Sequence, residues 1–504
     1  MNILQQLGLG FNVALEPTNL LLCFCGVLLG TLVGVLPGLG PAASVSLLLP
    51  MTFSMPPTGA VIMMAGILYG AQYGGSTTAI LVNIPGEASA VVTCLDGHQM
   101  AKQGRAGPAL GIAACGSFIA GTLGIIGLIL VAPPLVKVAL EFGPPEYFSL
   151  TLLGVLMLIY LSSGSIIRAL MMSAFGFLLS TIGQEIFTGT LRFTWGIFEL
   201  YDGVGLIPIA MGLFGISEVL VNLEEGLASR DIVKGKIGGL FPTLADWAVS
   251  IWSILRGTIV GFVLGSLPGG GMVISTFTSY AIEKKFSKHP EKFGNGAIEG
   301  VAGPESANNA ACQASFIPLL TLGIPPNATL AIIMGALMIH NIIPGPLLMP
   351  EHPDLFWGVV CSMYVGNAML LVLNLPLVGL WVKVLKVPYP MLFPLILLLC
   401  LIGVYSINGK VMDMILMIIF GIIGFLMKKL GYEIAPVLLS FILGGIMEPA
   451  LRRSLLMSDG RFSIFVTRPI SLGLMTGAAI LLLSPLVLKT LKKHPPRKGI
   501  KNTR

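Results

Sequence analysis

Two stretches of this sequence share one pattern at a separation of 231 residues. Residues 26–40 read GVLLGTLVGVLPGLG, and residues 257–271 read GTIVGFVLGSLPGGG. In both, glycine recurs at every fourth position of an apolar run, which then ends in a Pro-Gly break. The pattern predicts two related halves, each with a helix that breaks inside an apolar segment. Seven of the fifteen positions are identical: Gly26/Gly257, Gly30/Gly261, Gly34/Gly265, Leu36/Leu267, Pro37/Pro268, Gly38/Gly269 and Gly40/Gly271.

A second break occurs at a corresponding place in each half. The first half has Asn83-Ile84-Pro85-Gly86, and the second has Gly323-Ile324-Pro325-Pro326. Measured from proline to proline, the two breaks are 48 residues apart in the first half and 57 apart in the second. The charged segment 283–292 accounts for the longer spacing, so the order of the breaks supports the repeat.

The composition is that of a membrane protein. Only 10% of the 504 residues are charged, against about 25% in an ordinary soluble protein, and 55% are hydrophobic. The 63 glycines follow no collagen-like period. A soluble enzyme, a disordered chain and a fibre are excluded. We expect an all-α polytopic membrane protein with broken helices or re-entrant hairpins.

An apolar run needs about 20 residues to cross a bilayer as a helix. Several of the apolar runs in this chain are interrupted by Pro or Gly, so we expect about 11–13 crossings. The candidate segments lie near 18–36, 58–84, 108–132, 146–162, 165–184, 204–222, 249–267, 311–344, 356–384, 388–406, 411–429, 433–447 and 467–489.

A polar segment at 223–248 is predicted to link the two halves. We expect 1–222 to form the first half, 249–466 the second, and 467–504 a final transmembrane helix with a basic tail. Because Lys and Arg favour the cytoplasmic side of a membrane, the C-terminus is expected in the cytoplasm. The N-terminus is expected in the periplasm.

The two halves carry their basic residues in different loops. After the first break, the second half carries four lysines within 284–292, whereas 51–58 in the first half has no Lys or Arg. After the second break the bias reverses, with Lys102 and Arg105 in the first half and neither residue type in 345–355. Since basic loops stay in the cytoplasm, equivalent loops are expected on opposite sides of the membrane. This predicts two inverted repeats, as in many secondary transporters, with 18–50 and 249–282 as helical hairpins.

The glycine ladders and the breaks have different interpretations. Glycine at every fourth position leaves one helix face bare, so we attribute the ladders to close helix packing. A break frees backbone groups, which cost several kcal/mol each in hydrocarbon unless they are satisfied. A single break is best interpreted as a kink, but two breaks in symmetric places favour a substrate site. The helix that begins after each break has free N–H groups and a positive dipole end, which suit a carboxylate. We expect the backbone to approach substrate at Pro37, Gly38, Gly40, Pro268, Gly269 and Gly271.

Small polar residues lie beside the breaks, where an apolar span would normally exclude them. Their side chains can donate to carboxylates or ligate a sodium ion, and helix–helix hydrogen bonding is the alternative. Glu305 is a candidate for ion coupling because acidic residues inside a membrane are commonly functional. The alternative is that Glu305 lies at the exposed start of a helix, where its charge favours the helix dipole. The other residues predicted to bind substrate are Ser76, Thr77, Asn83, Gly86, Asn308, Asn309, Gly323 and Asn327.

Motifs of several enzyme classes are missing from the sequence. It contains no Gly-x-x-x-x-Gly-Lys-[Ser/Thr] and no His-Glu-x-x-His, which argues against a P-loop ATPase and a zinc protease. The seven cysteines show neither zinc nor disulfide spacing, and the dispersed basic residues do not indicate nucleic-acid binding. We expect no enzymatic activity, no metal and no cofactor, with H⁺ or Na⁺ as the coupling ion.

Five motifs around the breaks are characteristic of one family. They are Gly34-Val35-Leu36-Pro37-Gly38-Leu39-Gly40-Pro41, Tyr69-Gly70-Ala71-Gln72-Tyr73-Gly74-Gly75-Ser76-Thr77, Asn83-Ile84-Pro85-Gly86, Pro304-Glu305-Ser306-Ala307-Asn308-Asn309-Ala310 and Pro318-Leu319-Leu320-Thr321-Leu322-Gly323-Ile324-Pro325. With these motifs, nearly the whole chain resembles the large membrane subunit of tripartite tricarboxylate transporters. Two departures are Pro326, where the family pattern has Gly, and Gly303, where Ala is usual.

The resemblance implies a role in carboxylate uptake across the bacterial cytoplasmic (inner) membrane. It implies two partners, a small four-span membrane subunit and a periplasmic solute-binding protein that delivers the substrate. Import is then secondary-active and driven by an ion gradient, for tricarboxylates such as citrate or for related dicarboxylates and aromatic acids. Two alternatives stay open: a non-transporting scaffold subunit whose breaks are only kinks, and a passive organic-anion channel.

Overall fold

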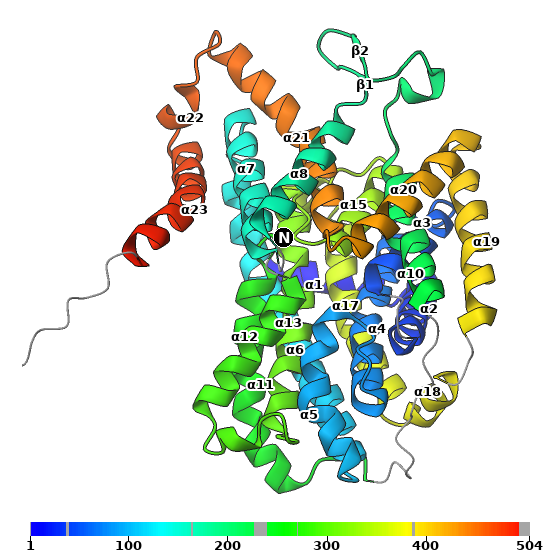
Figure 1. The fold of residues 1–504 in the computed structure, drawn as a ribbon. Helices are drawn as coiled ribbons and strands as arrows, with labels where there is room; N and C mark the ends of the chain where they lie inside the picture. The colour runs from blue at the N-terminus through cyan, green and yellow to red at the C-terminus, as the bar shows by residue number, and fades with distance from the viewer. Residues whose placement is uncertain are drawn as a thin grey trace, which may run out of the picture.

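The computed structural model describes residues 2–36, 40–162, 165–225, 239–269, 271–385 and 389–492. Within these ranges the chain is almost entirely helical, and the strands β1 (Gly183–Gln184) and β2 (Leu191–Arg192) form one short antiparallel hairpin. Figure 1 shows a bundle of helices with this hairpin projecting from one end, while α22 and α23 lie beside the bundle. The predicted all-α polytopic membrane fold is confirmed.

The helices that precede residue 226 alternate between long apolar elements and short ones. They are α1 (Ile3–Ala14), α2 (Pro17–Val35), α3 (Pro41–Thr52), α4 (Pro57–Val82), η1 (Ala88–Ala90), α5 (Val91–Lys102), α6 (Ala106–Ala139), α7 (Pro144–Leu161), α8 (Ile166–Ser180), η2 (Phe198–Leu200), α9 (Leu206–Ala210), the π-helical turn η3 (Met211–Ile216) and α10 (Ser217–Glu225).

The helices from residue 244 onward begin with the second glycine ladder. They are α11 (Leu244–Gly265), α12 (Gly271–Phe286), η4 (Pro290–Lys292), α13 (Glu299–Ala314), α14 (Phe316–Leu322), α15 (Ala328–Ile339), α16 (Leu348–Glu351), α17 (Pro353–Asn374), α18 (Val378–Val384), α19 (Tyr389–Asn408), α20 (Val411–Lys429), α21 (Ala435–Met457), α22 (Ile464–Thr467) and α23 (Pro469–Lys492).

Eight helical segments in the described part of the chain are long and apolar enough to cross a membrane. The predicted apolar segment 311–344 is divided among α13, α14 and α15, because the chain leaves helical geometry at 323–327. The total of 11–13 crossings stays a prediction, as does the division of the chain at 223–248, part of which (226–238) lies outside the described residues. The eight segments are α2, α6, α7, residues 206–224, α11, α17, α20 and α21.

The two glycine ladders pack against equivalent partners. On α2, a Cβ atom at Gly26, Gly30 or Gly34 would stand less than 3.0 Å from the carbonyl oxygen of the residue 37 positions further on, in α4. On α11, the glycines of the second ladder face α13 in the same way, at a separation of 46 positions. The difference of nine residues equals the difference between the predicted break spacings. The interpretation of the ladders as helix-packing surfaces is therefore confirmed.

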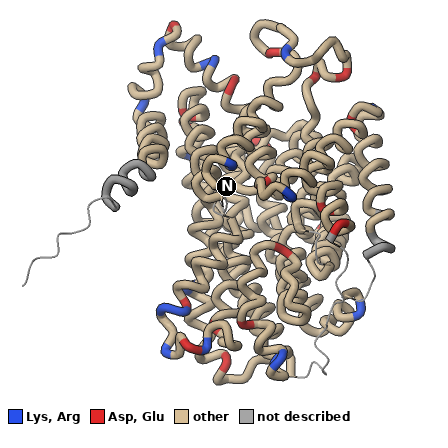
Figure 2. Tube along the Cα trace, in the orientation of Figure 1, with Lys and Arg blue, Asp and Glu red and all other residues tan. Residues whose placement is uncertain are grey.

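Loops from different halves meet at the ends of the bundle. At one end, Gln103 after α5 donates from Nε2 to the carbonyl oxygen of Asn295 after η4, at 2.9 Å. Asp246 at the start of α11 pairs with Arg105 near the same place, at 2.5 Å. Elsewhere, Nε2 of His340 after α15 lies 3.1 Å from the carbonyl oxygen of Thr52 at the end of α3. Figure 2 shows Lys and Arg at both ends of the bundle, and one group of them lies at the lower end, where α5, α11 and α12 turn.

Candidate functional site

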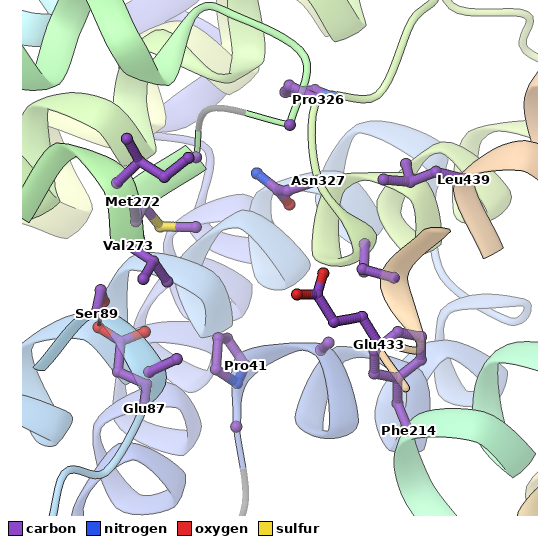
Figure 3. Close-up of a pocket in the computed structure, with 18 of the residues that line it drawn as sticks. Pro41, Glu87, Ser89, Phe214, Met272, Val273, Pro326, Asn327, Glu433 and Leu439 are labelled. Atoms are coloured by element: carbon purple, nitrogen blue, oxygen red, sulfur yellow. Dashed lines mark hydrogen bonds between the residues drawn. The ribbon is translucent and has the colours of Figure 1, made fainter. Parts of the chain in front are cut away.

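The broken helices of both halves meet around one cavity. Its volume is about 420 Å³, within the range of about 300–1,000 Å³ that is usual for small-molecule sites. The first half contributes Gly40 with the start of α3 and the segment 87–89, and the second half contributes Gly269, the start of α12 and Pro326 to Ala328. The end of α7, Phe214 of η3 and residues around the start of α21 close the remaining wall (Figure 3).

Four helices of twelve or more residues begin at this cavity. They are α3, α12, α15 and α21, and each places residues of its first turn on the wall. The first N–H groups of a helix lack intrahelical partners, and the helix dipole adds partial positive charge there. None of the described residues that line the cavity is Lys or Arg. An anion in this cavity would therefore be held by helix N-termini and neutral donors.

The second breaks of the two halves have the same backbone conformation. Asn83 ends α4 in the left-handed region, with φ 59° and ψ 27°, and Gly323 ends α14 there with φ 71° and ψ 22°. Four residues later, Glu87 has φ −147° and ψ 165°, and Asn327 has φ −148° and ψ 168°. The repeat predicted from sequence is therefore reproduced in the backbone at this break, and it makes Glu87 and Asn327 equivalent positions.

The breaks within each half are held together by direct contacts. The backbone N–H of Gly269 donates to the carbonyl oxygen of Pro326 at 2.9 Å, which joins the two breaks of the second half. In the first half, Gly86 packs against the carbonyl oxygen of Gly34, and a Cβ atom on Gly86 would overlap that oxygen. Thr78 of α4 donates to the carbonyl oxygen of Val35 at 2.9 Å, which satisfies one acceptor freed at the end of α2.

Asn327 presents a donor to the cavity. Its Oδ1 accepts from the backbone N–H of Leu330 at 3.0 Å and so caps α15. Its Nδ2 is buried and has no hydrogen-bond partner in the described part of the chain. Figure 3 shows the side chain projecting toward the middle of the cavity. An unpaired buried amide donor costs free energy, and an acceptor from a ligand would remove that cost.

A network of buried polar side chains lies next to the cavity and includes two glutamates. Glu87 lines the cavity and accepts from Ser89 Oγ at 2.5 Å and from Asn308 Nδ2 at 3.0 Å. Glu305 on α13 accepts from Ser76 Oγ at 2.5 Å and from Thr93 Oγ1. These four partners are neutral. The network joins α4, α5 and α13 through side chains that an apolar helix bundle would otherwise exclude.

The residues predicted from sequence to form the site fall into three groups. Gly40, Gly269, Gly271 and Asn327 line the cavity. The remaining described residues lie off its wall: Ser76 and Asn308 bond to glutamates, Asn309 donates to Ser117 Oγ at 2.7 Å, Thr77 contacts its own helix, and Asn83, Gly86, Pro268 and Gly323 shape the breaks. Pro37 and Gly38 lie outside the described residues.

Several wall residues were not predicted as ligands. Glu87 and Ser89 stand directly after the Ile-Pro-Gly break, so their position beside a break was a usable signal. Phe214 of η3 and Leu158 of α7 had no such signal, because they come from helices far from the breaks in sequence. Phe214 lies in a π-helical turn, a feature that is frequent at functional sites. No group of three or more His, Cys, Asp or Glu that could hold a metal ion occurs among the described residues.

Comparison with known proteins assigns this chain to a family and finds two relatives. The model of the tripartite tricarboxylate transporter TctA family matches residues 20–439, which is more than half of the chain. An uncharacterized 52.8 kDa protein in the TAR-I ttuC′ 3′ region of Agrobacterium vitis is 53% identical over 475 residues, covering 94% of each chain. A protein in the TAR-II ttuC′ 3′ region of the same organism is 53% identical over 230 residues, 45% of this chain and 95% of its own length. No solved structure matches. The chain belongs to the tripartite tricarboxylate transporter TctA family.

Proposed function

We propose that this protein is the membrane subunit that carries out secondary-active, ion-gradient-driven import of tricarboxylates or related carboxylates. It acts with a small four-span membrane subunit and with a periplasmic solute-binding protein that delivers the carboxylate. The complex resides in the bacterial cytoplasmic membrane, with the C-terminus of this chain in the cytoplasm and the N-terminus in the periplasm. Family membership supports a role in transport, and the cavity supports the chemical class of the substrate.

The convergence of helix N-termini on the cavity is the observation that carries this proposal. A carboxylate can accept from unpaired N–H groups in the first turns of α3, α12 and α15, and the unpaired Nδ2 of Asn327 adds a side-chain donor. The start of α21 offers mainly its dipole, because Pro436 has no N–H and the N–H groups of Val437 and Leu438 bond to the carbonyl oxygen of Ile434. Because the wall has no Lys or Arg among its described residues, the substrate is held by dipoles and hydrogen bonds. Such binding is moderate in strength, which suits a transporter that must also release its substrate.

Alternating access requires that the site open first to one side and then to the other, and inverted repeats favour this. The contact of Gln103 with Asn295 joins the loop after the second break of one half to the loop after the first break of the other. The contact of His340 with Thr52 joins the loop after the second break of the second half to the loop after the first break of the first half. These reciprocal contacts support an inverted arrangement, with the basic loops around Lys102 and Lys284 on the cytoplasmic side.

Ion coupling is assigned to the acids near the cavity. Glu305, predicted from the sequence as the coupling residue, is 1% exposed, and its carboxylate accepts hydrogen bonds from two hydroxyls. Burial of an ionised carboxylate beside neutral partners is costly, so a bound H⁺ or Na⁺ would stabilise this region. Coupling to such an ion would supply the free energy for accumulation without ATP.

Uptake by the reconstituted complex tests the proposal. The chain and its small membrane partner are placed in proteoliposomes, with the solute-binding protein outside, and uptake of labelled carboxylates is followed under an imposed H⁺ or Na⁺ gradient. We expect accumulation above the external concentration for at least one carboxylate. Equilibration without accumulation would indicate a passive channel, and the absence of any flux in an assembled complex would indicate a scaffold subunit.

A further inference from the structure

We propose that Glu87 is the residue at which the cavity exchanges a proton, so that the carboxylate enters together with H⁺. This inference rests on the proposed transport function and names its coupling ion. Glu87 lines the cavity, and its side chain is nearly buried, with 8% of the residue exposed. It is therefore placed where a proton and an anionic substrate can meet.

The surroundings of Glu87 favour a neutral carboxyl group. It accepts hydrogen bonds from Ser89 Oγ and Asn308 Nδ2, neither of which carries charge. No Lys or Arg lines the cavity among the described residues. An ionised carboxylate in such a place loses hydration without gaining a counter-charge, so protonation stabilises it.

The equivalent residue of the other half shows what protonation would achieve. Asn327 has the backbone conformation of Glu87 and directs an amide donor to the cavity at all pH values. Glu87 can donate to a substrate carboxylate only when it carries a proton, since an ionised carboxylate is solely an acceptor. One half thus offers a permanent donor, and the other offers a donor that requires H⁺.

Asn308 has an unpaired acceptor on the same side chain that bonds to Glu87. Its Nδ2 bonds to Glu87, and its Oδ1 is buried with no partner in the described ranges. An unpaired buried acceptor is costly, and an additional hydrogen in the network would allow it to be satisfied. The side chain of Asn308 is fully buried, so bulk water does not supply that hydrogen.

Binding of the anion and of the proton are linked by their charges. A negatively charged substrate near an ionised Glu87 is repelled, and near a protonated Glu87 it gains a hydrogen bond. By thermodynamic linkage, substrate binding then raises the proton affinity of Glu87 by the same factor by which the proton raises substrate affinity. Release to the side of higher pH returns the proton and the substrate together, which is symport.

The other titratable groups around Glu87 are less suited to this role. On α13, Glu305 accepts from Ser76 and Thr93 and does not line the cavity, and Cys312 is fully buried. Across the cavity, Glu218 forms an ion pair with Lys428. Glu433 also lines the cavity but is only half-buried, so water can solvate its charge. Glu291 of η4 does not line the cavity and is 68% exposed, so it provides a control outside the site.

The decisive experiment compares Glu87→Gln with Glu291→Gln in proteoliposomes that contain the complete complex. Two rates are measured in the same vesicles: accumulation driven by an inward proton gradient, and counterflow exchange at equal pH. For Glu87→Gln we expect the ratio of accumulation to counterflow to fall at least tenfold relative to the wild type. For Glu291→Gln the ratio should stay within about twofold, which is below about 0.5 kcal/mol.

A second variant guards against a folding defect. Glu87→Asp keeps a titratable group and should retain accumulation driven by the proton gradient, with a shifted dependence of the counterflow KM on pH. The inference is overturned if Glu87→Gln accumulates substrate as the wild type does, or if only a Na⁺ gradient drives the wild type. If only a Na⁺ gradient drives the wild type, carboxylate is still transported and the proposed function stands. If the wild-type complex shows neither accumulation nor counterflow, both proposals are rejected.

Discussion

Gly261 of α11 lies so close to Ala307 of α13 that a Cβ atom at position 261 would stand less than 3.0 Å from the carbonyl oxygen of Ala307. The obstacle is backbone, which cannot move aside as the end of a flexible side chain can. The same relationship recurs between Gly30 of α2 and Ile67 of α4. The two helix pairs next to the breaks are therefore held at backbone contact.

Gly261→Ala is expected to separate α11 from α13 and to destabilise the protein. Overpacking of this kind costs about 1–3 kcal/mol, even though alanine is the better helix former. The measurement is the thermal unfolding midpoint of the purified protein in detergent. Gly473→Ala in α23 is the control, because a Cβ atom there has no neighbour within 4 Å. Equal midpoints for the two variants would contradict the packing argument.

Asn327→Asp is expected to impair substrate binding while preserving the fold. Aspartate caps a helix about as well as asparagine, so the bond from Leu330 N–H is kept. The substitution removes the unpaired Nδ2 donor and adds negative charge to the cavity wall. We expect KM for carboxylate uptake to rise at least tenfold, about 1.4 kcal/mol, with an unchanged unfolding midpoint. A KM equal to that of the wild type would remove Asn327 from the site.

Asp96→Ala is expected to loosen the loop after α12. Asp96 Oδ1 accepts from the backbone N–H groups of Gly294, Gly296 and Ala297 at 2.8–2.9 Å, and Oδ2 accepts from the hydroxyl of Tyr280 at 2.9 Å. Hydrogen bonds to a charged group are worth about 1.5–3 kcal/mol each. Loss of even one such bond should increase local opening at least tenfold.

Limited trypsin digestion measures this opening, because Lys288 and Lys292 lie in the same loop. Cleavage there should accelerate at least tenfold in Asp96→Ala. Glu291→Ala serves as the comparison, since its side chain is 68% exposed and bonds to His289 at the surface. If both variants are cleaved at the rate of the wild type, Asp96 does not hold the loop.

Glu305→Ala is expected to cost more stability than Glu305→Gln. Alanine leaves the buried hydroxyl of Thr93 without its acceptor, at about 1–3 kcal/mol, whereas Ser76 Oγ can still donate to the carbonyl oxygen of Gln72 at 3.0 Å. Glutamine retains one oxygen acceptor and nearly the same volume. Thermal unfolding of the two variants in detergent gives the comparison, and a smaller loss for alanine would show that the hydroxyl of Thr93 bonds elsewhere.

Sequence reasoning located the elements of the site better than its contacts. The helix breaks were predictable because glycine and proline act on the local backbone, and Asn327 was predictable because it follows a break. The partners of Ser76 and Asn308 were not, because Ser76 bonds to a residue 229 positions away and Asn308 to one 221 positions away. Amides and hydroxyls that bind substrate and those that bond between helices have the same sequence signature.

The sequence by itself determined that this protein is a multi-pass membrane protein and where several of its helices break, and it predicted two related halves. These properties follow from composition and from backbone chemistry within a few residues. Tertiary structure decided which polar groups face the cavity and which form hydrogen bonds to one another in the network next to it. It brought Glu87 and Asn327 to equivalent positions at one cavity, because the glycine ladders set the spacing of helices far apart in the chain. Such a convergence depends on packing, and no local pattern specifies it.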